Sequence, residues 1–227
     1  MRICILTAIL GGFDFPVDPV KQELPEGVEV VFHRFTDEDF KPITGLTPRF
    51  QYRIPKMFGW QMFQGDYDYY FWLDGSVSLR RSDCIRWYLE QIGDNDIAFF
   101  KHPDRKTIKQ ETEHIEKKLK EGNKYIEKRY GNGLHKEQYA ECMADPEFKD
   151  EHLYASTAFF YKNTKEVREM MKDWFYNTAR FWTVDQIALS YALFKSGIKV
   201  KKIDEHLFKT GYLSLVSNHN NKPYKGK

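Results

Sequence analysis

The sequence predicts an α/β domain in which a mixed, mainly parallel sheet is flanked by helices. Continuous apolar and aromatic runs at 67–73 and 96–101 have the composition of strands that are buried on both faces. Segments with apolar residues at helical spacing, such as 164–180, separate these runs along the chain. Alternation of strands and helices favours parallel pairing, with helices covering both sides of the sheet.

The remaining elements follow from local patterns. Further strands are expected at 2–10, 27–35, 153–161 and 198–203. Helices are expected at 49–63, 82–92, 107–129, 164–180 and 183–196. Pro55 predicts a kink or a late start in the first helix, and Ser82 is the expected cap of the second. Residues 131–146 are predicted to be rich in loops.

Length and composition favour one soluble domain over residues 1–227. The chain has 41% hydrophobic and 30% charged residues, without a recognisable linker or repeat. Three scattered cysteines argue against a disulfide framework, and the opening apolar run is too short to span a membrane. A cytoplasmic protein, or a catalytic domain taken alone, is therefore expected.

Charge and aromatic content indicate the kind of partner. The net charge is only +2, but residues 195–227 carry eight basic and two acidic side chains. A basic segment favours an anionic partner such as phosphate, although a solvated lysine-rich surface explains it as well. Aromatic residues make up 16% of the chain, which suits stacking on a sugar or base, or simply an aromatic core.

Candidate site residues are those that follow the predicted strands, because ligands of open α/β sheets bind beyond the carboxyl ends of the strands. Asp74 comes directly after the aromatic run and precedes Gly75-Ser76. A carboxylate held there suits Mn²⁺ or Mg²⁺ on phosphate oxygens, since these cations prefer oxygen ligands. The alternative is a turn in which Asp74 only caps the loop.

The C-terminal segment offers a second candidate. His219 is positioned to complete a metal site begun by Asp74, and Lys222 to neutralise a diphosphate. The alternative is a disordered tail.

Several motifs resemble a glycosyltransferase-like domain family, formerly of unknown function, with plant cell-wall, mucilage and bacterial members. The matching features are TAILGGFD, the R-x-x-K of Arg53 and Lys56, YDYYFWLDGSVSL, FFKHPDR with a downstream Glu111, and the W-x-x-D-Q of Trp182, Asp185 and Gln186. The resemblance covers nearly the whole chain. It implies a GT-A-like (Rossmann-like) fold and a metal-dependent transferase that takes a sugar from a UDP-linked donor to a carbohydrate or glycoconjugate acceptor.

The resemblance also implies roles for particular residues. The residues implied to contact the nucleoside are Thr7, Ala8 and Asp37. Metal binding falls to Asp74, Ser76 and His219, and charge on the leaving group is offset by Arg53, Lys56 and Lys222. Donor sugar or acceptor contacts fall to His102, Arg105 and Glu111, and catalysis to Asp185 and Gln186, with Glu111 as a further catalytic candidate.

The sequence differs from the motifs of related transferases at two places. Transferases of this fold usually carry Asp-x-Asp, and this chain has Asp74-Gly75-Ser76, which removes one negative charge from the metal site. The tail HNNKPY is similar to the H-x-x-G-x-x-K-P-W element of glycogenin-like retaining transferases, but it is shorter and has Tyr224 in place of tryptophan. That similarity implies retention of the anomeric configuration.

Two other classes of function remain open. A metal-dependent phosphohydrolase needs clustered carboxylates and histidines, and the seven histidines are scattered along the sequence. A non-catalytic module that binds sugar or nucleotide is the other. Nucleic acid is not expected as a partner, because the basic segment from Lys106 to Arg129 has only Tyr125 as an aromatic residue for stacking.

Overall fold

The structure is a computed structural model that describes residues 1–39, 41, 43, 45 and 47–216. Its centre is a six-stranded sheet with the order β2-β1-β3-β6-β5-β7. Only β6 runs antiparallel to its neighbours, so the sheet is mixed and mainly parallel. The predicted fold class is confirmed. The strands are β1 (Arg2–Ala8), β2 (Glu29–Phe35), β3 (Tyr69–Leu73), β5 (Ile97–Lys101), β6 (Tyr154–Lys162) and β7 (Val200–Ile203).

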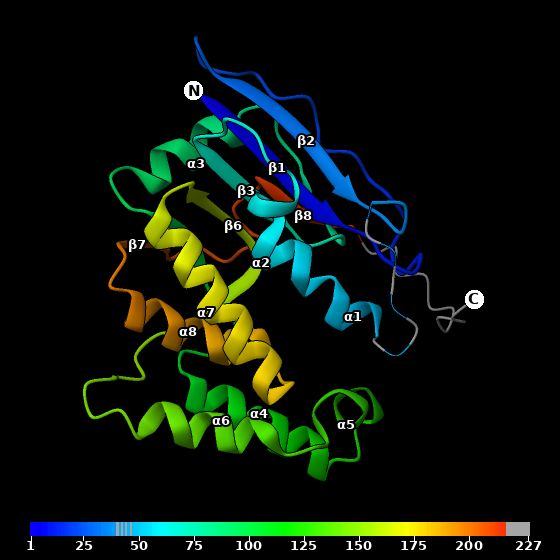
Figure 1. The fold of residues 1–227 in the computed structure, drawn as a ribbon, viewed down its shortest axis with the longest axis vertical. Coiled ribbons are helices and arrows are strands. Elements are labelled where there is room, and N and C mark those ends of the chain that lie inside the picture. The colour runs from blue at the N-terminus through cyan, green and yellow to red at the C-terminus, as the bar shows by residue number, and fades with distance from the viewer. Residues whose placement is uncertain (40, 42, 44, 46, 217–227) are drawn as a thin grey trace.

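Helices cover both faces of this sheet (Figure 1). On one face, α2 (Arg53–Met62), α7 (Lys165–Phe181) and α8 (Asp185–Ser196) cover a core that includes Leu6, Trp72 and Phe159. On the other face, α3 (Cys84–Ile92) packs over a second core that includes Phe71 and Phe160. In the described part of the chain, no helix combines the length and the apolar composition that crossing a membrane requires.

A third group of helices lies beyond α7 and α8, away from the sheet (Figure 1). It consists of α4 (Ile108–Lys120), α5 (Lys124–Tyr130) and α6 (Leu134–Met143), which share a separate apolar cluster with the start of α8. The single helix predicted at 107–129 is wrong, because Gly122 has a φ of +69° and the Asn123 side chain caps a new helix. The loop-rich segment predicted at 131–146 contains α6.

Smaller corrections concern the ends of elements. The helix predicted at 49–63 is two helices, α1 (Pro48–Gln51) and α2, and Pro55 lies in the first turn of α2, where its missing N–H costs no hydrogen bond. Asp83, not Ser82, precedes α3, and it makes no side-chain capping bond. A second sheet pairs β4 (Val77–Leu79) with β8 (Leu213–Leu215), although no strand was predicted in either segment.

The alternation of side chains along β3 decides where Asp74 lies. Trp72 belongs to the core under α2, α7 and α8, whereas Phe71 and Leu73 belong to the opposite core. Successive side chains of a strand point to opposite faces, so Asp74 shares the face of Trp72. The Trp72 indole N–H donates to an Asp74 carboxylate oxygen at 2.8 Å. The strand end therefore delivers a carboxylate to the face covered by α2 and α8.

Candidate functional site

The sheet brings most of the predicted site residues to one edge. Ala8 pairs with Phe35 at the ends of β1 and β2, and Leu6 pairs with Trp72 at the end of β3. Lys101, the last residue of β5, pairs with Tyr154, the first residue of β6. The carboxyl ends of the parallel strands and the start of β6 therefore lie along a common edge, as predicted from the sequence.

A buried lysine links the candidate carboxylates at this edge. The Lys56 ammonium, on α2, lies 3.2 Å from an Asp74 oxygen and 3.0 Å from an Asp185 oxygen. It also donates to the Ser156 hydroxyl at 3.2 Å, and that hydroxyl donates to Asp185 at 3.2 Å. Four segments that are distant in sequence thus form one polar group, called here the Lys56 cluster (Lys56, Asp74, Ser156 and Asp185).

Burial makes the charges of this cluster interdependent. The exposed fraction of the side chain is 1% for Lys56, 6% for Asp185 and 23% for Asp74. Burial lowers the pKa of Lys56, but Asp185 and Asp74 raise that pKa by more, so the ammonium stays charged. Burial raises the pKa of Asp185, and Lys56 and Arg53 overcome this and hold it well below the usual range. For Asp74, burial raises the pKa and Lys56 only partly offsets the effect.

The two carboxylates therefore have different chemistry. Asp185 is held as an anion by a neighbouring cation and is a weak proton acceptor. Asp74 is the more exposed of the two, and its Oδ1 accepts from both Lys56 and Trp72. A further positive charge near Asp74 would stabilise its ionised form.

Gly75 allows the chain after β3 to approach the end of β1 closely. A Cβ atom on Gly75 would lie 2.8 Å from the Ala8 carbonyl oxygen and 3.1 Å from an Asp14 carboxylate oxygen. Asp14 thus brings another carboxylate beside the Asp74-Gly75 peptide. The Thr7 hydroxyl is buried without a hydrogen-bond partner among the described residues, and it lines a small cavity with Gly75. That cavity has about 10 Å³ of space, roughly one water molecule.

Asp37 and Ser76 extend the same edge. Asp37 follows β2 and accepts a hydrogen bond from the Gly11 backbone N–H at 2.8 Å, so it fixes the loop after β1. The Ser76 carbonyl accepts from the Val216 N–H at 2.7 Å. Both residues stay partly or fully exposed.

Polar side-chain atoms of Arg53 and Gln186 are buried. Arg53 is 3% exposed and donates to the Thr183 carbonyl at 2.6 Å, while its Nε has no partner in the described part of the chain. The Gln186 side-chain amide oxygen is likewise buried and unpaired within the described residues. Polar atoms of this kind are satisfied in most proteins by water or ligand.

His102, Arg105 and Glu111 form a separate group. The Arg105 guanidinium pairs with the Glu111 carboxylate and lies 2.9 Å from the His102 Nε2. The His102 Nδ1 is within 3.2 Å of the backbone N–H groups of Asp104 and Arg105. Within the described ranges, no hydrogen bond or ion pair joins this group to the Lys56 cluster.

His102 faces hydrogen-bond donors on both sides of its ring, and a protonated imidazole has no acceptor to offer them. Burial and the neighbouring Arg105 lower its pKa to about 4, from about 6.5 in an unfolded chain. The folded state then binds fewer protons than the unfolded state between these values. The free energy of unfolding is therefore expected to fall by about 1–2 kcal/mol as the pH drops from 6.5 to 4.

Urea unfolding at several pH values checks this expectation. His102→Asn keeps an acceptor for the backbone N–H groups but does not titrate. The free energy of unfolding of this variant should therefore fall less than that of the wild type between pH 6.5 and pH 4. His206→Asn is the matched control, because the His206 Nδ1 also accepts a backbone N–H, from Phe208 at 3.2 Å. Identical pH profiles for the wild type and the two variants would rule out the role given to His102.

Part of the predicted metal site lies outside the described residues. Among residues 1–39, 41, 43, 45 and 47–216, no three His, Cys, Asp or Glu side chains gather as a metal-binding group. His219 and Lys222, predicted from the tail, lie outside the described residues. An Asp14 carboxylate oxygen lies 3.1 Å from the position of a Cβ atom on Gly75, the residue between Asp74 and Ser76.

Sequence reasoning missed two contributors and left a third without a role. Trp72 was interpreted only as part of a strand, whereas Ser156 lies in the segment 154–157, a candidate because of its place at a strand end, with no role assigned. Both side chains donate to the clustered carboxylates. Asp14 lies in the TAILGGFD motif, but its approach to Gly75 depends on how the loop after β1 folds back. A serine next to a strand start was the only sequence signal for Ser156.

The architecture and the site define an α/β domain with a mainly parallel sheet and a polar cluster at the carboxyl edge of its strands. No family model matches the sequence, and no curated protein matches it. Among solved structures, the chain is similar to the apo form of mouse xyloside xylosyltransferase 1, with a TM-score of 0.44 and 9% identity. That similarity covers 90% of this chain and 86% of the other chain.

Proposed function

We propose that this protein is a glycosyltransferase that moves a sugar from a UDP-linked donor to a hydroxyl of a carbohydrate or glycoconjugate, with the help of Mn²⁺ or Mg²⁺. The observation that carries the proposal is the Lys56 cluster. It places the partly exposed Asp74 carboxylate and the buried Asp185 carboxylate, whose pKa is held well below the usual range, on either side of a cation, at the edge of the sheet where ligands of such folds bind.

The donor nucleotide would lie across the ends of β1, β2 and β3. The Thr7 hydroxyl at this edge has no hydrogen-bond partner among the described residues, and Asp37 is exposed. Gly75 brings the chain after β3 against the end of β1 beside them. We assign the nucleoside to these residues.

The divalent cation would be held by Asp74, with oxygen ligands from Asp14 or Ser76 and from the donor diphosphate. Mg²⁺ commonly uses one or two carboxylates together with substrate phosphates, so a set this small fits the ion. When bound, the cation supplies positive charge to the departing diphosphate. His219 and Lys222 remain proposed contributors from the C-terminal segment.

The residues of the Lys56 cluster act on the reacting sugar. The bond from the anomeric carbon to the diphosphate oxygen breaks, and a bond to the acceptor oxygen forms, whose proton leaves with the diphosphate. Positive charge develops on the sugar as the first bond breaks. Asp185, which stays ionised, would stabilise that charge, and the unpaired Gln186 amide oxygen would accept from a sugar hydroxyl.

Lys56 adds positive charge near the diphosphate side of the site, whereas Arg53 lies on the side of Asp185. The Lys56 ammonium is held in place by both aspartates, so little reorganisation is needed when the leaving group gains charge. Glu111 is tied to Arg105, and we assign it to positioning Arg105 for contact with the donor sugar or acceptor.

Thermal-shift measurements test the donor site. UDP with Mn²⁺ is expected to raise the Tm, by the equivalent of about 2.7 kcal/mol at one hundred times the Kd, and UDP or Mn²⁺ alone should do much less. Asp74→Asn should remove the joint effect. Asp94→Asn is the control, since Asp94 is exposed and precedes β5 at the opposite end of that strand.

The other classes of function give different results. A phosphohydrolase would release phosphate from UDP-sugar, with turnover that no sugar acceptor increases. A binding module would gain stability from sugar or oligonucleotide without Mn²⁺ and turn nothing over. A transferase releases UDP faster when an acceptor is added, and the Asp74 variant should not.

A further inference from the structure

Three arginines from three helices gather next to the Lys56 cluster. Arg49 is on α1, Arg53 on α2 and Arg129 on α5. The Arg49 guanidinium donates to the Tyr130 hydroxyl and lies 4.8 Å from the centre of that ring, which brings α1 and α5 together. Arg49 and Arg53 are both close enough to Arg129 to repel its charge. Arg49, Arg53 and Arg129 are called the arginine group below.

In the part of the chain that the structure describes, none of the three side chains forms a salt bridge with an Asp or Glu, although Arg53 and Arg49 both help to keep Asp185 ionised. Burial, and to a smaller extent the neighbouring Arg49, lower the pKa of Arg129 to about 10. The buried Arg53 also keeps one N–H without an acceptor among the described residues. The group has the charge and the free donors to hold an anion.

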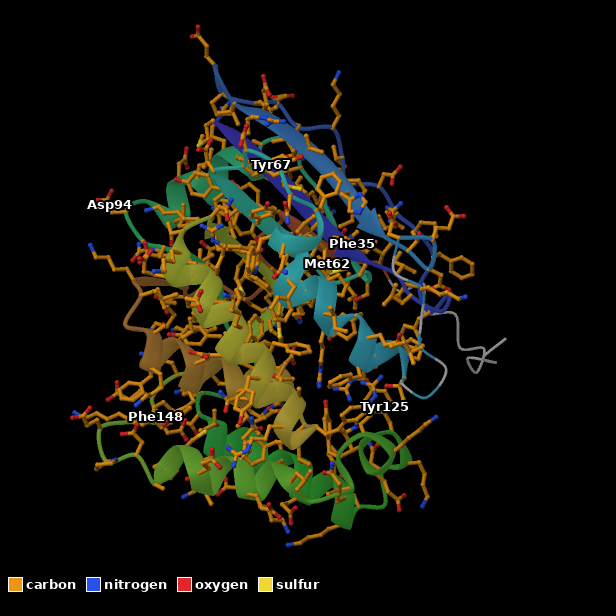
Figure 2. All side chains as sticks on the ribbon, viewed as in Figure 1. Phe35, Met62, Tyr67, Asp94, Tyr125 and Phe148 are labelled. Atoms are coloured by element: carbon orange, nitrogen blue, oxygen red, sulfur yellow. The ribbon has the colours of Figure 1, made fainter. Side chains whose placement is uncertain are left out.

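Exposed aromatic rings lie beside the arginines. Phe50 and Trp182 stack with their ring centres 4.0 Å apart, and the Arg53 guanidinium is 5.9 Å from the Phe50 centre. Trp182 is 39% exposed and has a φ of +50°, which a bulky residue adopts only when its surroundings hold it there. Tyr125, 59% exposed under the Arg129 guanidinium, lies between α5 and α1 (Figure 2).

The arginine group lies on the Asp185 side of the Lys56 cluster. Arg53 and Arg49 both act on Asp185, whereas the main charged neighbours of Asp74 are Lys56 and Asp185. The diphosphate of the donor is proposed to bind at Asp74. The arginine group is therefore placed for a second ligand, with Asp185 between the two.

We propose that the arginine group binds an oxyanion on the acceptor, so that the acceptor is an acidic sugar whose carboxylate or phosphate contacts Arg49, Arg53 and Arg129 and whose ring stacks on Trp182. Arginine matches both anions through paired N–H donors, and an indole face stacks on a sugar ring. The assignment of the bound anion to the acceptor rests on the proposed transferase function. The existence of an oxyanion site at the arginine group does not depend on that function.

Binding can be followed through the Trp182 indole N–H signal in NMR spectra, assigned by its loss in Trp182→Phe. Glucuronate and glucose 6-phosphate, as the carboxylate and phosphate probes, are expected to shift this signal, and glucose at the same concentration is not. Arg129→Gln should weaken binding of the charged probes roughly tenfold, since a hydrogen bond to a charged group contributes on the order of that factor.

Two variants complete the experiment. Arg129→Lys keeps the charge and loses the paired donors, so it should weaken binding less than Arg129→Gln. Arg168→Gln is the matched control, because Arg168 also lies over an aromatic ring, at 5.5 Å from the centre of Trp60, but outside the group. Arg168→Gln should leave the affinity for glucuronate and glucose 6-phosphate unchanged.

Several outcomes separate this proposal from the proposed function. Equal shifts with glucose, no shift with any probe, or equal weakening by Arg168→Gln would overturn the oxyanion site. If Arg129→Gln weakened UDP–Mn²⁺ binding as much as glucuronate binding, the arginines would belong to the donor site and the proposal would be wrong. Loss of UDP–Mn²⁺ binding in the wild type, with charged probes still bound, would instead remove the transferase function and leave the oxyanion site standing.

Discussion

Replacing Lys56 with methionine is expected to lower the free energy of unfolding by about 3–5 kcal/mol, because it leaves Asp74 and Asp185 without the cation that they share. Methionine preserves most of the side-chain volume, so the loss reports on charge more than on packing. Urea unfolding at pH 7 gives the value. The variant should also lose the proposed transferase activity, since the orientation of Asp185 depends on the same ammonium.

The control for this result is Lys124→Met. Lys124 pairs with Glu127 at 2.8 Å on the exposed surface of α5, where water screens the ion pair and its contribution to stability is small. A loss below about 1 kcal/mol for Lys56→Met would mean that the two carboxylates are not both charged in the folded protein, and the account of the Lys56 cluster would then be wrong.

Replacing Gly75 with alanine is the second change with a large expected effect. The new methyl group would meet the Ala8 carbonyl oxygen at 2.8 Å, and that atom belongs to the backbone at the end of β1. The ends of β1 and β3 must separate to make room, at a cost of about 1–3 kcal/mol. Because both strand ends contribute to the proposed donor site, binding of UDP–Mn²⁺ should weaken in the same variant.

Gly59→Ala is the matched comparison. Its methyl group would meet Leu6 Cδ1 at 2.5 Å, which is the end of a flexible side chain, and alanine favours the helical conformation of α2 by about 1 kcal/mol. The stability of Gly59→Ala should therefore stay within about 1 kcal/mol of the wild type. Equal losses in both variants, with donor binding intact in Gly75→Ala, would show that the close approach at Gly75 does not shape the site.

Local sequence patterns were sufficient for most of the sheet. The aromatic run before Asp74 and the β-branched run before Ala8 are strands because few other conformations bury such continuous apolar segments. The helix predicted at 164–180 is α7, which the Thr164 hydroxyl caps by accepting from the Val167 N–H. The helices beyond the sheet were less predictable. The hydrophobic face of α6 is weak, and its burial depends on neighbours that the sequence does not identify.

The sequence by itself determined the fold class and the edge at which polar residues collect, because both follow from the order of strands and helices and from which residues end the strands. Only the tertiary structure decided that Lys56 joins Asp74 to Asp185, and that Arg129 lies near Arg49 and Arg53. The physical reason is distance along the chain. A charge interaction depends on separation in space and on burial, and neither can be read from residues that lie far apart in sequence.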